Sequence, residues 1–306
     1  MRQAGSIEVE VWRGPVVESR HLVVASVHDA AGRELERYGD PDVVTFWRSA
    51  AKPFQARPWV DAGVAERYGW GEREIAVMCA SHVGADEHAE LVRAMLAGLD
   101  LSEADLQCDE GAGALRARHG CSGNHTGFLA GCRLHGWDTA TYRAADHPAQ
   151  RAALEASADA AGCGVDGLTL GVDGCGIVVC ATPIATLARA YARLPLLAPR
   201  IAAAMRAHPV LIEGEGEPDT QTMQGFPGLI SKAGAEGVGC ASLPDGRGVA
   251  VKAMDGNDRA TGPALTALLA RCLGLDDVPD GVVAVARPLV RNDHDDAVGV
   301  IRAVLP

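Results

Sequence analysis

Ser49 and Lys52 have the residue types and spacing of a catalytic pair, within the stretch RSAAKPFQ at residues 48–55. Residues three apart share one face of a helix, so the lysine nitrogen can reach the serine hydroxyl. A serine hydroxyl is a weak nucleophile until a base takes its proton, and a neutral lysine can be that base. The pattern therefore predicts a serine nucleophile activated by lysine. The structural alternative is a helix start with a capping serine and a solvated lysine.

The choice of lysine at this position favours the catalytic interpretation. Lysine accounts for only three of the 28 basic residues, namely Lys52, Lys232 and Lys252. Arginine does not lose its proton in proteins, so it cannot replace lysine as a base. Because Pro53 disfavours helical geometry at the residue before it, we expect the helix to begin near Lys52, with Ser49 on the entering turn.

A second lysine, Lys232, lies in the stretch SKAG on a predicted strand. A lysine followed by a small residue and a glycine resembles the Lys-Thr-Gly element that accompanies Ser-x-x-Lys in penicillin-binding enzymes. Such a site needs a further hydroxyl between the two lysines. Ser81 and Ser122 both qualify, and spacing alone does not choose between them. Four histidines are expected to be surface or hydrogen-bonded residues rather than catalytic ones: His82, His88, His119 and His125.

Two glycine-rich stretches, HGCSGNHTG and GVDGCGIVV, each contain one cysteine, Cys121 and Cys175 respectively. Thiolates are soft metal ligands, and Asp173 could be a third donor or an orienting group. The alternative is a pair of tight turns packed against a sheet, and both interpretations stay open from spacing alone. Because the chain has nine cysteines and no secretion signal, we do not expect a disulfide framework.

The composition limits the classes of partner. The 306 residues carry a formal charge of −12, which argues against a nucleic-acid surface. No apolar run reaches the length of a membrane span, and the first residues lack the apolar segment of a signal peptide. We therefore expect a cytoplasmic protein with no nucleic-acid and no membrane partner.

The predicted elements indicate an α+β fold. Strand patterns dominate residues 1–48 and 228–306, whereas helical periodicity dominates residues 49–227. Terminal strands with central helices predict one antiparallel sheet packed against a central helical lobe, with a ligand cleft where they meet. We treat residues 1–306 as a single domain built in this way.

Several stretches together resemble the rhizobial-type, thermolabile L-asparaginase family, also called class 3. They occur in the family's order: RSAAKPFQA, CASHVGADEH, CSGNHTG, LGVDGCGIVV, the Asp219-Thr220 region and KAGAEGV. The resemblance implies a serine β-lactamase/glutaminase-like fold and hydrolysis of L-asparagine to L-aspartate and ammonia. It also implies two serine–lysine pairs, Ser49 with Lys52 and Ser81 with Lys232, and so selects Ser81 over Ser122.

The resemblance further implies a zinc ion near the site, held by two cysteines and a lysine. Cys121 and Cys175 match the cysteines and Asp173 matches a nearby acid, but Asn124 stands where the family has its lysine. An amide oxygen is a weak zinc donor beside thiolate, so we expect weak or substoichiometric zinc and no required cofactor. Asn124, Asp173 and Arg48 are assigned to substrate binding. Glu217 stands where the family tends to have arginine.

The sequence therefore predicts an amidohydrolase that acts on L-asparagine through a Ser49 acyl-enzyme. One alternative is another serine amidase or penicillin-recognising hydrolase of the same fold. A second alternative is a catalytically silent ligand-binding relative, although a binding site has no need of two serine–lysine pairs. The expected partner is the small-molecule substrate, and a homodimer is kept as a hypothesis.

Overall fold

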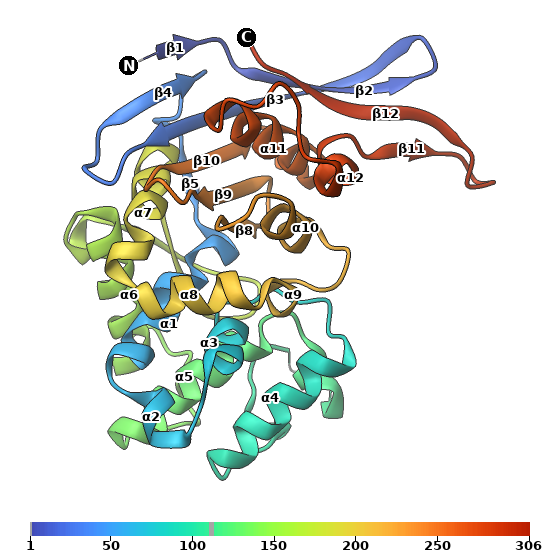
Figure 1. Ribbon diagram of the computed structural model, residues 1–306. Helices are drawn as coiled ribbons and strands as arrows, with labels where there is room; N and C mark the ends of the chain where they lie inside the picture. Colours follow the sequence, from blue (N-terminus) through green and yellow to red (C-terminus); the bar gives the residue numbers. More distant parts are fainter. Residues whose placement is uncertain (1, 110–112) are drawn as a thin grey trace. The chain divides into compact units, whose positions relative to one another are not determined.

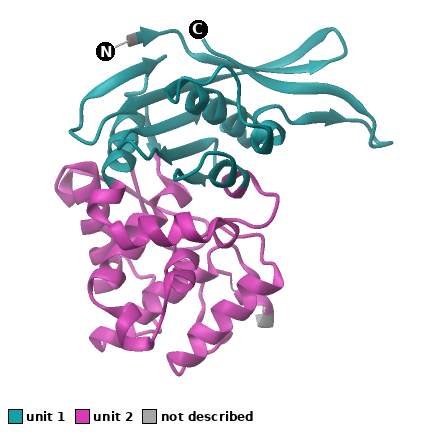
Figure 2. Ribbon diagram, in the orientation of Figure 1, with its two compact units in different colours: residues 1–45, 182–193, 221–306 teal, residues 46–181, 194–220 magenta. Residues whose placement is uncertain are grey.

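The computed structural model describes residues 2–109 and 113–306, which divide into two compact units (Figure 2). Unit 1 comprises residues 1–45, 182–193 and 221–306, and unit 2 comprises residues 46–181 and 194–220. The predicted α+β class is confirmed, because the terminal segments supply an antiparallel sheet and the central segment is mainly helical. The bounds of the two units differ from the strand-rich and helix-rich regions of the sequence at residues 46–48, 182–193 and 221–227.

Unit 1 is built on one sheet of strands from both ends of the chain (Figure 1). Its main path has the order β11-β12-β2-β3-β10-β9-β8, with antiparallel neighbours throughout, while β4 pairs with β3 and β1 pairs parallel to β4. The strands are β1 (Arg2–Ala4), β2 (Ile7–Arg13), β3 (Val16–His28), β4 (Glu34–Tyr38), β8 (Ile230–Gly234), β9 (Val238–Ser242), β10 (Gly248–Ala253), β11 (Leu289–Arg291) and β12 (Ala297–Val304).

Helices cover both faces of this sheet at its centre. An added Cβ at Gly239 would lie 2.6 Å from Thr261 of α11 (Thr261–Cys272), so helix and sheet meet closely there. Gly248 faces α7 (Ile184–Leu197), where a Cβ would lie 2.1 Å from the Ala192 nitrogen. Gly248 pairs with Ser242 of β9, so these two residues face the same side of the sheet. Ser242 lies three residues after Gly239, and side chains along a strand alternate in direction, so Gly239 faces the other side. The two helices therefore pack on opposite faces, and α12 (Val283–Ala286) contacts α11.

Lys252 of β10 has a structural role within unit 1. Its Nζ donates hydrogen bonds to the backbone oxygen of Glu236 at 2.8 Å and to that of Ala253. Glu236 lies in the turn between β8 and β9 and has a left-handed φ of 66°. The lysine ammonium thus ties this turn to the end of β10.

Unit 2 is mainly helical and also contains β6 and most of β7, which belong to a three-stranded sheet of order β5-β7-β6. No helix among the described residues of the chain is long and apolar enough to cross a membrane. The strands are β5 (Val44–Phe46), β6 (Thr169–Val172) and β7 (Val178–Pro183). The helices are α1 (Lys52–Asp61), α2 (Val64–Tyr68), α3 (Glu72–Met78), α4 (Asp86–Gly98), α5 (Ser122–His135), α6 (Pro148–Ala161), α8 (Pro199–Ala207), α9 (Pro209–Ile212) and the boundary helix α10 (Pro218–Gly225). Short 3₁₀ turns include η1 (Arg48–Ala51), η2 (Glu103–Asp105) and η3 (Gly113–Arg118).

The buried helix α5 forms the centre of unit 2. Glycines recur at every fourth position, so one face of the helix carries no side chain and neighbouring helices approach closely. An added Cβ at Gly123, Gly127 or Gly131 would lie 2.1 Å from the oxygen of Val77, 2.9 Å from the sulfur of Met78 and 2.3 Å from the ring of Trp59, respectively. This contact fixes the start of α5 against the end of α3, and both helix ends lead to predicted site residues.

Candidate active site

Helix α1 begins at Lys52, and Ser49 lies in the preceding turn η1, as the sequence predicted. The Lys52 backbone N–H donates to the backbone carbonyl oxygen of Ser49, which joins the turn to the helix. The Trp47 N–H donates to Cys180 O of β7 at 2.9 Å, and the Trp47 and Phe54 rings pack edge to face with centroids 5.5 Å apart. These contacts hold the turn and the first residues of α1 in place.

The Lys52 side chain is buried among acceptors from two other segments. Its Nζ lies 2.6 Å from Ala80 O, 2.9 Å from Ser81 Oγ, 3.2 Å from Cys121 Sγ and 3.4 Å from Gly120 O. Only 3% of the residue is exposed, so these contacts replace hydration. Lys52 therefore connects a serine hydroxyl and a cysteine sulfur, which are groups that can exchange protons with an amine.

Ser49 lies beside an ion pair. Its hydroxyl makes no hydrogen bond within the described part of the chain, so it is not bonded to Lys52 here. The preceding residue, Arg48, has a left-handed φ of 49°, which is uncommon for a residue with a side chain. Its guanidinium contacts the Asp173 carboxylate at 2.9 Å, and both side chains are partly exposed. The structure thus brings together two of the three residues predicted to bind substrate.

Ser81 is held in an extended segment between α3 and α4. Its N–H donates to Ile212 O at 2.8 Å, and the next N–H, of His82, donates to Gly120 O at 3.2 Å. Gly84, which closes the segment, has a φ of 74°, a conformation that favours glycine. Backbone hydrogen bonds to two neighbouring segments therefore set the position of the Ser81 hydroxyl.

The alternative hydroxyl, that of Ser122, is buried and already engaged in hydrogen bonds. It donates to Ala117 O at 2.8 Å and lies 3.0 Å from Nε2 of His82. Since Nδ1 of His82 accepts from the Gly84 N–H at 3.1 Å, Nε2 carries the proton and donates to Ser122. Burial lowers the pKa of His82 to about 3, and its ring stacks on His88 with centroids 4.5 Å apart. His82 is therefore a neutral, hydrogen-bonded histidine.

Cys121 and Cys175 are hydrogen-bond partners in unit 2. Cys121 is the N-cap of α5. Cys175 lies in a turn in which the Asp173 N–H donates to Ile177 O at 2.9 Å and the Gly176 N–H donates to Asp173 O at 2.8 Å. The hydrogen bond from Cys175, with the positive charge of nearby Lys52, holds the pKa of the Cys121 thiol well below its ordinary value. The same hydrogen bond and burial raise the pKa of Cys175. The pKa values of the two thiols are therefore shifted in opposite directions.

The donors present do not fit the zinc centre that the family resemblance implied. The Asn124 side chain, which replaces the family's lysine, is buried and directs its Nδ2 to Met78 O at 3.2 Å. Across residues 2–109 and 113–306, no three His, Cys, Asp or Glu side chains are placed to hold a metal ion. Two thiols alone are an incomplete tetrahedral set. No step proposed below passes through a metal.

Lys232 lies on β8 in unit 1, and 1% of it is exposed. Its Nζ donates to Ala233 O at 2.9 Å. Its pairing with Ser81 stays a prediction, as does substrate binding by Asn124. The sequence did not reveal the contact between Lys52 and Cys121, which are 69 residues apart, because it depends on how α5 packs against α3.

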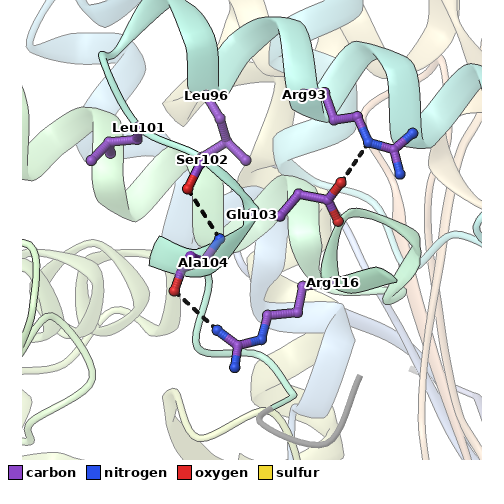
Figure 3. A pocket seen from close by; sticks show the side chains of 7 residues that line it. All are labelled: Arg93, Leu96, Leu101, Ser102, Glu103, Ala104 and Arg116. Atoms are coloured by element: carbon purple, nitrogen blue, oxygen red, sulfur yellow. Dashed lines mark hydrogen bonds and ion pairs between the residues drawn. The ribbon is translucent and has the colours of Figure 1, made fainter. Parts of the chain in front are cut away.

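A separate pocket of about 640 Å³ opens in unit 2, beside α4 (Figure 3). Glu103 pairs there with Arg93 and accepts a hydrogen bond from the Ala117 N–H at 2.8 Å. None of the predicted site residues lines it, so it is not part of the candidate active site. Its lining residues are Arg93, Leu96, Leu101, Ser102, Glu103, Ala104 and Arg116.

The fold and the site define an α+β protein with a buried lysine that contacts a serine hydroxyl and a cysteine sulfur. A model of the family described as L-asparaginase II matches residues 9–303, and the chain therefore belongs to that family. The family resemblance stated from the motifs is confirmed. No curated protein matches the chain.

Similar solved structures are distant in sequence. Mglu in its tris and glutamate form is 14% identical, with 82% of this chain and 59% of that chain covered and a TM-score of 0.49. Mglu in its native form with 4.3 M NaCl is 17% identical over 92% and 67% of the two chains, with a TM-score of 0.49. A β-lactamase from Mycobacterium bovis is 16% identical over 83% and 95%, with a TM-score of 0.39. The chain spans 59% to 64% of the Mglu chains in their tris and glutamate, native and glutamate forms.

Proposed function

We propose that the protein is an amidohydrolase that converts L-asparagine and water to L-aspartate and ammonia through a serine acyl-enzyme. Membership in the L-asparaginase II family supports the reaction class. The contact that carries the mechanism is the one between Lys52 Nζ and Ser81 Oγ, at 2.9 Å and largely shielded from water. A shielded amine beside a hydroxyl is suited to proton transfer during attack on an amide.

In the proposed mechanism, Ser49 is the nucleophile and Lys52 its base. The Lys52 amine accepts the Ser49 proton as Ser49 Oγ forms a bond to the side-chain amide carbon of the substrate. The resulting tetrahedral centre collapses and the carbon–nitrogen bond breaks. Ser81, already bonded to Lys52, donates its proton to the departing nitrogen and recovers one from the Lys52 ammonium group. One proton thus moves from Ser49 to ammonia through two adjacent groups.

Deacylation uses the same groups in reverse order. Water loses a proton to Lys52 as it attacks the carbonyl carbon of the aspartyl ester. The bond from that carbon to Ser49 Oγ then breaks, and the Lys52 ammonium group returns its proton to the Ser49 oxygen as L-aspartate leaves. Because Ser49 has no hydrogen-bond partner within the described residues, its hydroxyl is free to turn toward substrate and toward Lys52.

Recognition of the substrate's charged end is assigned to Arg48 and Asp173. An amino acid carries one carboxylate and one ammonium group, which match the guanidinium and the carboxylate of this pair. The two side chains are 25% and 17% exposed, so a ligand can reach them. A substrate that contacts both would replace one ion pair with two, directly beside Ser49. The matched charges favour a free α-amino acid over an uncharged amide.

The test is an ammonia-release screen of the purified protein with asparagine, glutamine and small neutral amides. Asparagine should be turned over, and Ser49→Ala should lower kcat at least about a thousandfold, since nucleophile removal typically has this effect. Ser102→Ala is the matched control, because Ser102 lines the separate pocket beside α4 and should leave kcat unchanged. Near-normal ammonia release by Ser49→Ala would contradict the nucleophile assignment.

A parallel nitrocefin assay separates the alternatives. Turnover of nitrocefin without turnover of asparagine would identify a penicillin-recognising hydrolase and overturn the proposed substrate. Thermal stabilisation by asparagine with no ammonia released would identify a binding protein and overturn the proposed activity.

A further inference from the structure

Three polar side chains beside the candidate active site have no part in the proposed mechanism: His82, His88 and Ser122. All three are buried in unit 2, and His82 directly follows Ser81 in the chain. We propose that His82 is a positioning residue, whose hydrogen bond to Ser122 holds the Ser81 hydroxyl where it can deliver a proton to the leaving nitrogen. This inference rests on the proposed function, because the proton concerned is the one that ends on ammonia.

The hydrogen bonds of the His82 ring run in one direction from residue to residue. The Gly84 N–H donates to Nδ1 at 3.1 Å, so Nε2 carries the ring proton and donates to Ser122 Oγ at 3.0 Å. The Ser122 hydroxyl in turn donates to Ala117 O at 2.8 Å. The series begins at a backbone N–H and ends at a backbone carbonyl, so its direction cannot be reversed without leaving a buried group unpaired. The ring is therefore fixed at both nitrogens.

The bond between His82 and Ser122 joins two segments that hold Lys52. One segment contributes Ser81 Oγ, 2.9 Å from Lys52 Nζ, and the other contributes Gly120 O, 3.4 Å from it. His82 follows Ser81, and Ser122 lies two residues after Gly120. The segments also meet through the backbone, where the His82 N–H donates to Gly120 O at 3.2 Å. Without the ring this side-chain bond is lost, and the Ser81 hydroxyl is held less firmly against Lys52.

His88 restrains the plane of the His82 ring. The two rings are stacked, with centroids 4.5 Å apart and an interplanar angle of 8°. His88 lies in the first turn of α4, and its Nε2 donates to Val210 O of α9 at 3.2 Å. The last residue of α9, Ile212, accepts the Ser81 N–H. The stack thus connects His82 to a third segment that also holds Ser81.

The placement of Ser81 matters most where the leaving group needs a proton. The departing nitrogen of an amide must be protonated as the carbon–nitrogen bond breaks, and Ser81 supplies that proton in the proposed mechanism. A 4-nitrophenolate group leaves an ester as a stable anion, and the proton that Lys52 takes from Ser49 then passes to solvent. Both substrates need Ser49 and Lys52 for the attack. Displacement of Ser81 should therefore slow the amide and spare the ester, whereas damage to the fold would slow both equally.

The test compares kcat/KM for asparagine with kcat/KM for the β-(4-nitrophenyl) ester of L-aspartate, followed as ammonia and as 4-nitrophenol. His82→Leu removes both ring nitrogens and should lower the amide-to-ester ratio at least about tenfold, because small displacements slow a reaction strongly. Ser122→Ala removes only the acceptor of the ring N–H and should lower the ratio too. His82→Gln, whose amide N–H can replace the ring N–H, should retain more of the ratio than His82→Leu.

His147 supplies the matched control. It is also buried in unit 2, with 7% exposed against 4% for His82, and its ring makes the same two kinds of bond. Its Nδ1 accepts from the Ala149 N–H at 3.1 Å, and its Nε2 donates to Asp138 O at 3.0 Å. Neither partner is a residue of the candidate active site. His147→Leu should therefore lower the free energy of unfolding in a urea titration and leave the amide-to-ester ratio unchanged.

The outcomes separate this inference from the proposed function. A wild-type ratio in His82→Leu, or equal losses on both substrates, would overturn the positioning role while the proposed function stands. If His82→Leu does not fold, the ratio in Ser122→Ala decides in the same way. A wild-type protein that releases ammonia from no amide would overturn the proposed function, and the positioning role with it.

Discussion

Replacement of Gly123 by alanine tests how closely α5 and α3 must approach to assemble the site. The new Cβ would lie 2.1 Å from the Val77 oxygen and 2.8 Å from the Val77 carbonyl carbon. Ordinary van der Waals contact begins at 3.4 Å, and the obstacle is backbone rather than the end of a flexible side chain. The helices must therefore separate by about 1 Å, since a close-packed interior has no void to absorb the methyl group.

The expected magnitude follows from two opposing effects. Alanine in place of glycine favours the helix by about 1 kcal/mol. Overpacking against a rigid neighbour costs about 1–3 kcal/mol, and a backbone obstacle belongs at the upper end of that range. We therefore expect Gly123→Ala to lower the free energy of unfolding by about 2 kcal/mol, the difference of these terms. Gly98→Ala is the matched control, because no heavy atom lies within 4 Å of its Cβ position in α4.

The assay is urea unfolding followed by tryptophan fluorescence, with ammonia release measured on the same samples. Gly98→Ala should stabilise the protein by about 0.5–1 kcal/mol, the helix-propensity effect alone. Gly123→Ala should also lower kcat, because α3 leads to Ser81 and α5 begins beside Cys121, and both contact Lys52. Equal or greater stability of Gly123→Ala would refute the close approach of these helices.

Three further predictions concern titration, metal and lysine chemistry. Burial lowers the pKa of both His82 and His125 from 6.5 to about 3. Between these two pH values the unfolded protein binds protons that the folded protein does not. The free energy of unfolding is therefore highest above pH 6.5 and decreases as the pH is lowered from 6.5 toward 3. Urea titrations should show a loss of about 1.4 kcal/mol per pH unit for each histidine, and His82→Gln should remove one such contribution; an unchanged slope would contradict it. Elemental analysis should find less than one zinc ion per wild-type chain, and a larger amount of zinc per chain in Asn124→Lys. One zinc ion per wild-type chain that remains bound after treatment with a chelator would disprove this prediction. The predicted pairing of Lys232 with Ser81 adds a second base beside the relay through Lys52. Because arginine keeps its proton, Lys232→Arg should lower kcat by about a hundredfold or more, while Lys252→Arg should have little effect; equal kcat values would exclude a base at Lys232.

The local features of the candidate site could be predicted from the sequence. Ser-x-x-Lys followed by Pro53 predicted a helix that begins at Lys52 after an irregular turn, because proline restricts the residue before it. The terminal strands were predictable from alternation, and the Asp245-Gly246 turn between β9 and β10 from residue type. These features are determined by residues that are close in the sequence, so they can be predicted without knowledge of the tertiary structure.

The remaining features depend on tertiary packing. Residues 230–242 form the hairpin of β8 and β9, whose turn contains Glu236 in a left-handed conformation. Helix α5 begins at Ser122, because Gly123 fits against the backbone of α3. The contact of Lys52 with Cys121 and the ion pair of Arg48 with Asp173 link residues 69 and 125 positions apart, for which no local pattern exists.

The sheet of unit 1 has a consequence for synthesis of the chain. Strand β3 pairs with β10, and β2 pairs with β12. The N-terminal strands are therefore synthesised well before their C-terminal pairing partners. About 220 residues separate His28 from its partner Gly248, which at about 5–20 residues per second is roughly 10–45 seconds of translation. Throughout that interval the apolar segment Val23–Val27 has no β10 beside it, and an open strand edge invites pairing with other chains. Yield in the cell will therefore depend on protection of this segment by chaperones as well as on the stability of the finished protein.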